Sequence, residues 1–332
     1  MDPHELDQAI LDAATADDPR TLAGLLVRRA GRRLAGAEYA DAANDLGDAV
    51  GFLQRTGQRD EAAHVRQLQA TALRGGGFLD EAIECARDAC ELSTDGTPWR
   101  VSAETELGEA LLLSGRHDDA ITAYSSALAH GASAGLVEVA QAALHRRIAM
   151  AHSLAGRHVA AAEAADEAAR LFAIARRPDG EARARIEAAT SLVAAGFGSA
   201  AVDAIAEART AAGTDHAALA ELELLEAARA LTAGAPAEAL AHARAARAEA
   251  LEGAVVLPYV GAAFTIGELL DHGGDRAGAY ESLAVGWVTA ADKIGQELAA
   301  AMFRPRLEAL RARWGAAEFE RVKDAYYATR RS

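Results

Sequence analysis

A pair of histidines flanked by arginines is the nearest that this sequence comes to a reactive site. His145 and His152 are seven residues apart and would share one face of a helix, with Arg146 and Arg147 beside them. Such a group suits a metal ion or an anionic ligand. A metal site takes three or four converging ligands, however, and this spacing puts the two imidazoles about 10 Å apart along the helix axis. We therefore expect no metal ion and no cofactor.

The sequence motifs of covalent and nucleotide chemistry are also missing. The glycines at 75–77 and 273–274 are not followed by the Lys-Ser or Lys-Thr of a phosphate-binding loop, and no serine stands in a Gly-x-Ser-x-Gly turn. Cys85 and Cys90 would point about 140° apart on a helix, so we expect two core thiols and no disulfide between them. We predict that the protein is not an enzyme.

Composition restricts both the fold and the partners. The 332 residues are 51% apolar but only 5% aromatic, and the alanine-rich apolar share is typical of closely packed helices, so we predict an all-α fold. The net charge of −15 disfavours nucleic acid as a partner. The longest apolar stretch, residues 254–267, is interrupted by Pro258 and is shorter than the roughly 20 residues of a membrane span. Because the amino terminus is acidic, unlike a secretory leader, we expect a cytoplasmic protein.

A short pattern recurs along most of the chain. A small residue is followed five residues later by alanine, usually with an aromatic residue or histidine and an acid between them. We interpret each copy as the turn between two helices, because glycine tolerates the left-handed conformation that ends a helix and an acid favours the start of the next. The match at Gly57 falls between two copies and is interpreted as the loop before a new helix. The seven copies, separated by 40, 38, 41, 40, 38 and 40 residues, start at Ala37, Gly77, Gly115, Gly156, Gly196, Gly234 and Gly274.

The prolines support this division of the chain. Proline fits the first turn of a helix and damages its interior, and all seven prolines are predicted to lie at helix boundaries. Pro305 is expected to open or kink a terminal helix. The six that are expected to open helices are Pro3, Pro19, Pro98, Pro178, Pro236 and Pro258.

The third copy resembles the tetratricopeptide repeat, or TPR. Glu104 replaces the usual leading tryptophan of that repeat, and Ala132 replaces the usual closing proline. The period near forty resembles the longer variety found in kinesin light chains and in the sensor regions of large bacterial transcription activators, whereas a HEAT-like array is the alternative. The residues that carry the resemblance are Leu107, Gly108, Leu111, Gly115, Ala120, Tyr124 and Ala127.

The resemblance implies a right-handed superhelical solenoid of helix-turn-helix repeats with a concave groove. We expect an amino-terminal capping helix in residues 1–18, seven TPR-like hairpins in 19–290 and carboxy-terminal capping helices in 291–332. Small residues such as Gly108 and Gly267 would let neighbouring helices approach closely. The last 29 residues, from 304 to 332, hold eight basic and four acidic residues, which suits an acidic partner, the acidic body of the chain or a solvated helix face.

The resemblance also implies that the first helix of each hairpin lines the groove. Arg74, Arg146 and Arg183 are then candidates to grip carboxylates, and Met150 and Phe264 to receive an apolar side chain. The alternative is that most of the groove residues are merely solvated. The lysine and asparagine clamp with which some TPR proteins hold a terminal Glu-Glu-Val-Asp is missing. The full set of groove residues is Gln67, Thr71, Arg74, Thr105, Glu109, Arg146, Met150, Arg183, Thr190, Phe264 and Glu268.

The sequence therefore predicts a non-catalytic scaffold or adaptor that binds a peptide or protein segment in a bacterial cytoplasm. The alternative is a regulator that senses a small ligand or a signalling peptide and acts through another chain, since no DNA-binding domain accompanies the repeats. A homodimer is a further open alternative.

Overall fold

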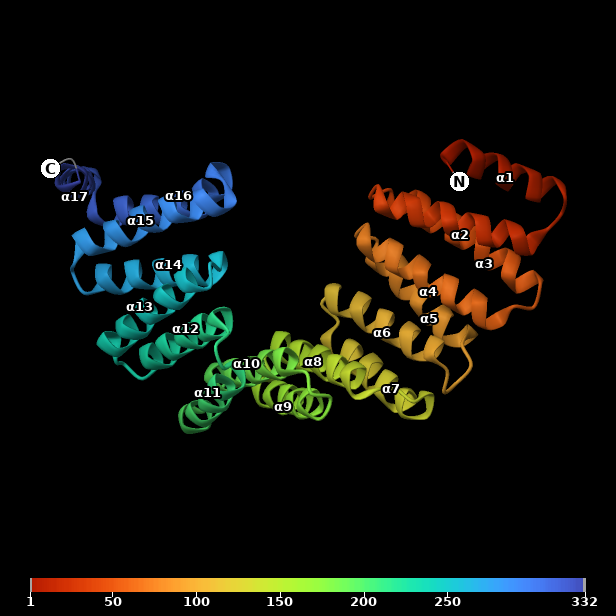
Figure 1. Cartoon of the computed structure of the whole chain (residues 1–332), viewed down its shortest axis with the longest axis horizontal. Coiled ribbons are helices and arrows are strands. Elements are labelled where there is room, and N and C mark those ends of the chain that lie inside the picture. Colours follow the sequence, from red (N-terminus) through yellow and green to blue (C-terminus); the bar gives the residue numbers. More distant parts are fainter. Residues whose placement is uncertain (1, 331–332) are drawn as a thin grey trace. The chain divides into compact units, whose positions relative to one another are not determined.

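The structure is a computed structural model that describes residues 2–330, and within this range the chain forms seventeen α-helices and no β-strand (Figure 1). The all-α prediction is confirmed. In chain order the helices are α1 (Pro3–Thr15), α2 (Pro19–Ala35), α3 (Tyr39–Arg55), α4 (Arg59–Gly75), α5 (Leu79–Leu92), α6 (Pro98–Leu113), α7 (His117–Ala134), α8 (Glu138–Leu154), α9 (His158–Ile174), α10 (Pro178–Ala194), α11 (Gly198–Ala212), α12 (His216–Thr232), α13 (Pro236–Glu252), α14 (Val256–His272), α15 (Arg276–Ile294), α16 (Gln296–Trp314) and α17 (Ala316–Thr329).

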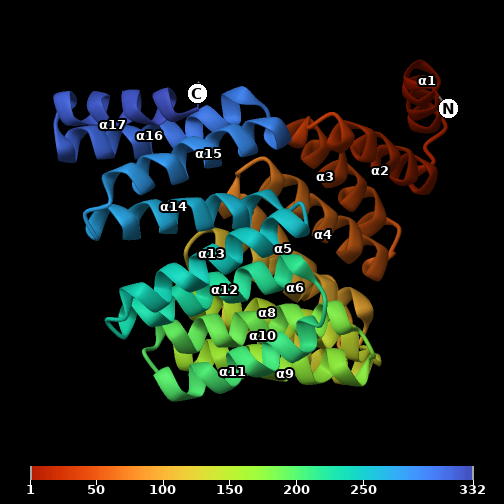
Figure 2. The same ribbon diagram turned by 60° about the vertical axis from the view of Figure 1, so that its left-hand side comes forward.

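The helices divide into two compact units, Met1–Arg177 with α1 to α9 and Pro178–Ser332 with α10 to α17. Within each unit, every helix packs against the one that follows it (Figure 2). The first unit holds the hairpins α2–α3, α4–α5, α6–α7 and α8–α9, preceded by α1. The second unit holds α10–α11, α12–α13 and α14–α15, followed by α16 and α17. We call the two members of each hairpin its first helix and its second helix.

The backbone confirms the predicted turns inside the hairpins. The residue that starts each of the seven turns has a positive φ, from 59° at Ala37 to 82° at Gly77 and Gly274. Glycine adopts this conformation without steric cost, whereas alanine at position 37 costs about 1 kcal/mol. Gly57 also has a positive φ and lies just before α4, as predicted.

The prolines lie at helix starts with one exception, and the first helix also has a capping box. The Asp2 carboxylate accepts a hydrogen bond from the Glu5 backbone at 2.8 Å, and the Glu5 carboxylate accepts one from the Asp2 backbone at 2.7 Å. Six prolines lie in the first turns of helices, but the prediction of a boundary at Pro305 was wrong, because α16 continues through it. Pro305 and Ala301, the residue whose carbonyl loses its helical donor, are both exposed, so water replaces the missing bond.

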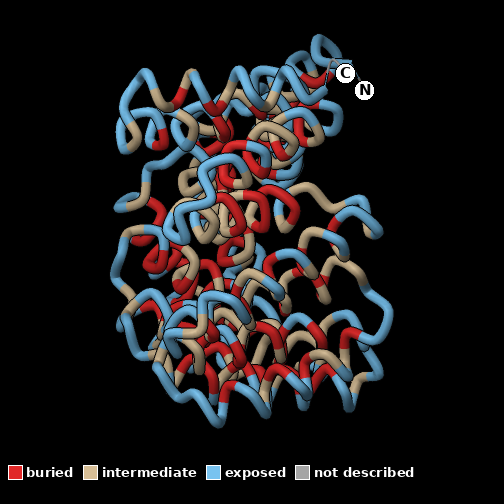
Figure 3. Tube along the Cα trace, turned by 90° about the vertical axis from the view of Figure 1, so that its left-hand side faces the viewer, coloured by how far each residue is buried: buried red, intermediate tan, exposed pale blue. Residues whose placement is uncertain are grey.

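Small residues allow close packing of the helices. A Cβ atom at Gly108 on α6 would lie 2.4 Å from a ring carbon of Tyr124 on α7, so only glycine permits this approach. Ala120 and Ala127 of α7 are fully buried. Figure 3 shows buried segments where helices face their neighbours and exposed segments along the loops.

Aromatic residues gather at the end of the second unit. Phe303 of α16 is fully buried, and Phe319 of α17 packs on Tyr280 with a ring-centroid distance of 5.6 Å. Trp314 and Tyr326 pack partly buried against the same core, whereas Tyr327 is exposed. Across residues 2–330, the helices lack the combination of length and hydrophobicity that a membrane span requires.

Candidate binding site

All eleven residues predicted for the groove lie on first helices, seven in the first unit and four in the second. Neighbouring first helices lie side by side: α4 packs on α6, and α12 packs on both α10 and α14. Side chains of consecutive repeats therefore meet on these helices. We call the surface that the first helices of one unit share its first-helix face.

The first-helix face of the first unit has a polar cluster built around a buried carboxylate. Glu106 of α6, which the sequence analysis did not select, is 5% exposed and accepts hydrogen bonds from α4. The Thr71 hydroxyl donates to Glu106 Oε2 at 2.9 Å, and Arg74 Nε donates to Glu106 Oε1 at 2.5 Å. Gln67 Nε2 donates to Thr71 Oγ1 at 3.1 Å. The structure thus brings Gln67, Thr71 and Arg74 together, and it directs Arg74 to a carboxylate of the chain itself.

Helix α8 continues this face on the other side of α6. Glu109 accepts a hydrogen bond from Arg147 of α8, whereas Arg146 is half-buried and Met150 is exposed. The Thr105 hydroxyl is used within its own helix, where it donates to the Val101 carbonyl at 2.7 Å. Met150 therefore presents an apolar side chain to solvent, and Thr105 does not present a free donor.

The phenol of Tyr124, on α7, lies close to the charged side chains of this face. Its side chain is fully buried, and its hydroxyl has no hydrogen-bond partner within residues 2–330. Burial raises the pKa of the Tyr124 phenol, Glu109 raises it further, and the guanidinium groups of Arg147 and Arg74 lower it. The phenol therefore stays neutral.

In the second unit, Arg183 and Thr190 lie on α10. Arg183 Nη1 donates to Glu221 Oε2 of α12 at 2.6 Å, and the Thr190 hydroxyl donates to the Ile186 carbonyl at 2.7 Å. Arg183, like Arg74, is engaged with a carboxylate of its own unit, so a ligand carboxylate would have to share or replace that partner.

Phe264 and Glu268 line a pocket of about 180 Å³ between α14 and α16. Its floor is apolar and includes Phe264, whose ring meets that of Phe303 edge to face at 4.8 Å. Arg306 of α16 lies 4.9 Å over the Phe264 ring and donates to Glu268 Oε1 at 2.6 Å. The other lining residues are Gly267, Leu283, Ala309, Leu310 and Arg313.

The pocket has a rim of paired charges around an apolar interior. Arg313 forms an ion pair with Asp271 at 2.9 Å, and Trp314 Nε1 donates to the same carboxylate at 2.5 Å. These bonds hold the end of α14 against the end of α16. Such a site accepts one apolar side chain and offers guanidinium groups to an anion beside it.

Comparison with known proteins identifies the fold. No family model matches the sequence, and no curated protein matches it. Among solved structures, a putative kinesin light chain of Podosopora anserina with nearly identical TPR-like repeats is 18% identical, with a TM-score of 0.50 over 59% of this chain and 97% of that chain. This chain has the TPR fold. The likeness to the kinesin light chain also confirms the resemblance to the longer TPR variety.

Two further structures share the TPR fold over most of this chain. The apo form of the quorum sensor NprR from B. thuringiensis is 13% identical, with a TM-score of 0.57 over 87% of this chain and 84% of that chain. Aspartyl phosphate phosphatase F from Bacillus subtilis is 13% identical, with a TM-score of 0.52 over 86% of this chain and 75% of that chain. At these identities the likeness concerns the fold alone.

Within the TPR fold, sequence reasoning missed the partners that hold the candidate residues. Each of these partners bonds to a predicted residue of a first helix. Glu106 bonds to Arg74, Glu221 to Arg183, and Arg306 to Glu268. A signal existed in the spacing, because Glu221 and Arg306 each stand 38 residues after their partner, close to one repeat period. Glu106 carried no such signal, since its separation from Arg74 is 32 residues.

Proposed function

We propose that the protein is a non-catalytic scaffold of the bacterial cytoplasm that holds a peptide or protein segment against its first helices. The observation that carries this proposal is the pocket between α14 and α16, with its floor at Phe264 and its rim at Glu268 and Arg306. Its volume equals about six water molecules at about 30 Å³ each, which suits one apolar side chain of the partner.

The rim chemistry selects what stands next to that apolar side chain. The side chains of Arg306 and Glu268 are 48% and 51% exposed, so their ion pair is open to competition from a partner carboxylate. An acidic residue beside the buried apolar residue would replace Glu268 on Arg306. The preferred segment is therefore an apolar residue flanked by Asp or Glu.

The state of the cysteines supports a non-catalytic role. Burial raises the pKa of the Cys90 thiol to about 12, and burial also raises the pKa of the Cys85 thiol. A thiol acts as a nucleophile through its thiolate, so neither cysteine is activated. Within residues 2–330, no group of three His, Cys, Asp or Glu side chains is placed to hold a metal ion.

A sensing role is the second candidate. The likeness in fold to the quorum sensor NprR favours a regulator that binds a signalling peptide and acts through another chain. The two roles share the same site and differ in the response. A sensor changes its affinity for a second protein when the peptide binds, whereas a scaffold does not.

Selection from a phage-displayed library of random dodecapeptides tests the binding proposal with purified full-length protein. We expect enrichment of apolar residues flanked by acids. Ala309→Trp, which fills the pocket, should weaken the selected peptides at least about tenfold, equivalent to about 1.4 kcal/mol. Ala312→Trp, on the exposed face of the same helix outside the pocket, is the matched control. Failure to enrich any motif, or equal affinity for both variants, would contradict the proposal.

A further inference from the structure

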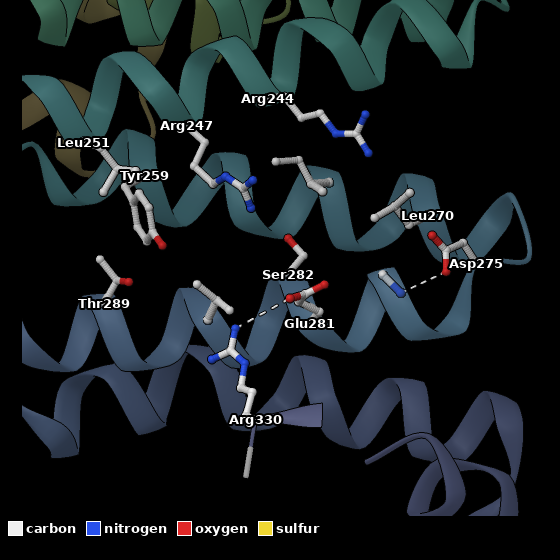
Figure 4. A pocket seen from close by; sticks show the side chains of 13 residues that line it. Arg244, Arg247, Leu251, Tyr259, Leu270, Asp275, Glu281, Ser282, Thr289 and Arg330 are labelled. Carbon is white, nitrogen blue, oxygen red and sulfur yellow. Dashed lines mark hydrogen bonds and ion pairs between the residues drawn. The ribbon is translucent and has the colours of Figure 1, made fainter. Parts of the chain in front are cut away.

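A second pocket lies on the other helices of the second unit (Figure 4). The second helices α13 and α15 both pack on α14, and a cavity of about 550 Å³ remains between them. Leu251, Ile266, Leu270 and Val285 give it an apolar lining. The cavity shares no lining residue with the pocket between α14 and α16.

Two arginines on α13 reach this cavity without a partner. Arg244 and Arg247 are three residues apart and therefore lie on the same side of the helix. Neither guanidinium forms a hydrogen bond or ion pair with any other residue in the range 2–330, although many other arginines of the chain are paired. Figure 4 shows Arg247 pointing from α13 toward α15.

The carboxylates on the opposite wall are already engaged. The Asp275 side chain accepts a hydrogen bond from the Gly278 backbone at 2.9 Å and caps α15. Glu281 forms an ion pair with Arg330 at 3.5 Å, and Arg330 also lies 4.5 Å over the Tyr326 ring, which fixes it at the pocket edge. Arg244 and Arg247 are therefore the charged groups of this pocket that have no hydrogen-bond or ion-pair partner among the described residues.

Two hydroxyl groups complete one end of the cavity. Tyr259 of α14 is only 4% exposed, yet its hydroxyl lines the cavity and forms no hydrogen bond with the described residues. Thr289 of α15 stands beside it in Figure 4, and its hydroxyl likewise has no partner within residues 2–330. A ligand with polar groups at this end can therefore form hydrogen bonds with both hydroxyls.

We propose that this pocket binds the carboxy-terminal residue of a peptide, with its carboxylate on Arg244 and Arg247. The apolar side chain of that residue lies on Ile266 and Leu270. The hydroxyls of Tyr259 and Thr289 meet the polar backbone of the peptide.

The mixed lining favours a peptide end over other anions. Arginine binds a planar carboxylate through two parallel hydrogen bonds, and a carboxylate carries one negative charge. A phosphate group carries more charge than a carboxylate and therefore meets stronger repulsion from Asp275 and Glu281 on the opposite wall. The second oxygen of each of these carboxylates is left to accept a hydrogen bond from a backbone N–H group, which a peptide supplies and a simple carboxylic acid lacks.

Acetylated tripeptides ending in leucine or phenylalanine test this site in the full-length protein. Saturation-transfer NMR detects contact with the terminal side chain, and isothermal titration calorimetry gives the Kd. We expect the free acids to bind and the matching carboxy-terminal amides to bind at least about tenfold more weakly. 4-Methylpentanoate has the leucine-like branched chain and a carboxylate but no peptide bond, and it should bind more weakly than the leucine tripeptide. Inorganic phosphate should not displace the leucine tripeptide.

Two double variants distinguish the loss of this site from the loss of positive charge elsewhere on the protein. Arg244→Gln with Arg247→Gln should abolish tripeptide binding without unfolding the protein, because neither arginine is bonded. The charge-matched control is Arg87→Gln with Arg304→Gln, two exposed arginines that also form no ion pair within residues 2–330. Tyr259→Phe should weaken binding about threefold to tenfold, the usual value of one hydrogen bond.

Several outcomes would overturn the assignment. These are equal binding of acid and amide, no binding of any tripeptide, equal loss in the two arginine double variants, binding of 4-methylpentanoate as tight as that of the tripeptide, or displacement by phosphate. Ala309→Trp should leave tripeptide binding unchanged, so this site and the proposed scaffold function fail independently.

Discussion

Glu109 on α6 and Arg147 on α8 form an ion pair between consecutive first helices and are 38 residues apart in the chain. The same separation joins Arg183 to Glu221, and Glu268 to Arg306. Because repeats start every 38 to 41 residues, each pair links nearly equivalent positions of adjacent helices. The sign of the first partner differs among the three pairs, so the spacing recurs and the order of charges does not.

Reversing one end of the Arg183–Glu221 pair should destabilise the second unit. Glu221→Arg places two guanidinium groups face to face and should lower the free energy of unfolding by about 1 kcal/mol, because the pair is partly exposed. Urea unfolding at low salt measures this loss. Adding Arg183→Glu restores an opposite-charge pair and should recover the stability to within about 0.5 kcal/mol.

High salt and a variant at an isolated charged residue are the controls for these two variants. The loss should shrink at about 1 M salt, where exposed charges are screened. Glu252→Arg, at an exposed position that forms no ion pair within residues 2–330, should change stability by less than about 0.5 kcal/mol. A double variant as unstable as Glu221→Arg alone would show that this pair does not couple the helices.

Glu104 should be indispensable to the first unit, although it occupies the position of an apolar tryptophan in the TPR pattern. Its side chain is 4% exposed and accepts hydrogen bonds from Arg100 at 2.7 Å and Ser126 at 2.8 Å, and it meets His130 Nδ1 at 2.9 Å. Glu104→Ala removes the buried acceptor that Arg100, Ser126 and His130 share, and it leaves the half-buried Arg100 with only the exposed Asp95 as a carboxylate partner, so it should cost about 3 kcal/mol. Hydrogen exchange of the α6 and α7 amides measures the loss where it occurs.

Glu84→Ala is the matched control for the Glu104 variant. Glu84 is exposed on α5 and forms no ion pair with residues 2–330, so its loss should cost no more than about 0.5 kcal/mol. If Glu104→Ala were as mild as this control, the network around Glu104 would not stabilise the unit.

Local chemistry made the hairpins readable from the sequence. A positive φ at Gly77 or Gly115 is a requirement of one residue, so the residue type reveals it. Pro305 shows the limit of such local rules, because the exposure of the Ala301 carbonyl decided whether the helix could continue. Exposure depends on how the helices pack, so the residues next to Pro305 in the sequence do not predict it.

The partners of the candidate residues could not be read in the same way. The sequence correctly placed Arg74 and Arg183 on first helices, but it could not show that Glu106 and Glu221 bind them, because that depends on the sideways register of two helices. Arg244 and Arg247 were missed altogether. They lie on a second helix, where the resemblance to TPR proteins implied no groove, and only the packed unit shows that they lack partners.

Tyr124→Phe should stabilise the first unit. The Tyr124 hydroxyl is buried without a hydrogen-bond partner in the described residues, and removing an unsatisfied polar group relieves a cost of about 1 kcal/mol or more. The ring remains and keeps its packing on Gly108. Urea unfolding should show a higher midpoint with an unchanged slope.

A loss of stability in Tyr124→Phe would contradict this account and would indicate a hydrogen bond at the hydroxyl. Tyr39→Phe, at a half-buried tyrosine on α3, is the control for the chemical change itself. It should leave the midpoint nearly unchanged, since water reaches a partly exposed hydroxyl.

Mild acidification should destabilise the first unit. Burial lowers the pKa of His64, His145 and His152 below the ordinary value of 6.5. The unfolded chain then binds protons at a higher pH than the folded chain does. Stability is therefore complete above about pH 6.5 and decreases as the pH falls from there toward the folded pKa values.

Burial outweighs the neighbouring charges at these histidines. His64 stacks on Trp99 with a ring-centroid distance of 4.3 Å, and its Nδ1 has no hydrogen-bond partner in the described residues. Glu167 raises the pKa of His145 while Arg170 lowers it. At His152, Arg157 lowers the pKa, whereas Asp118 and Glu163 raise it. Burial is the largest cause for all three, so the neutral imidazole is the folded form.

Hydrogen exchange between about pH 7.5 and pH 5, corrected for intrinsic rates, measures this change in the α4, α6 and α8 amides. A triple variant, His64→Gln with His145→Gln and His152→Gln, should lose most of the pH dependence in this window, whatever its stability at neutral pH. His4→Gln, at an exposed histidine on α1, should retain it. An equally steep pH dependence in the triple variant would show that other groups cause the acid sensitivity.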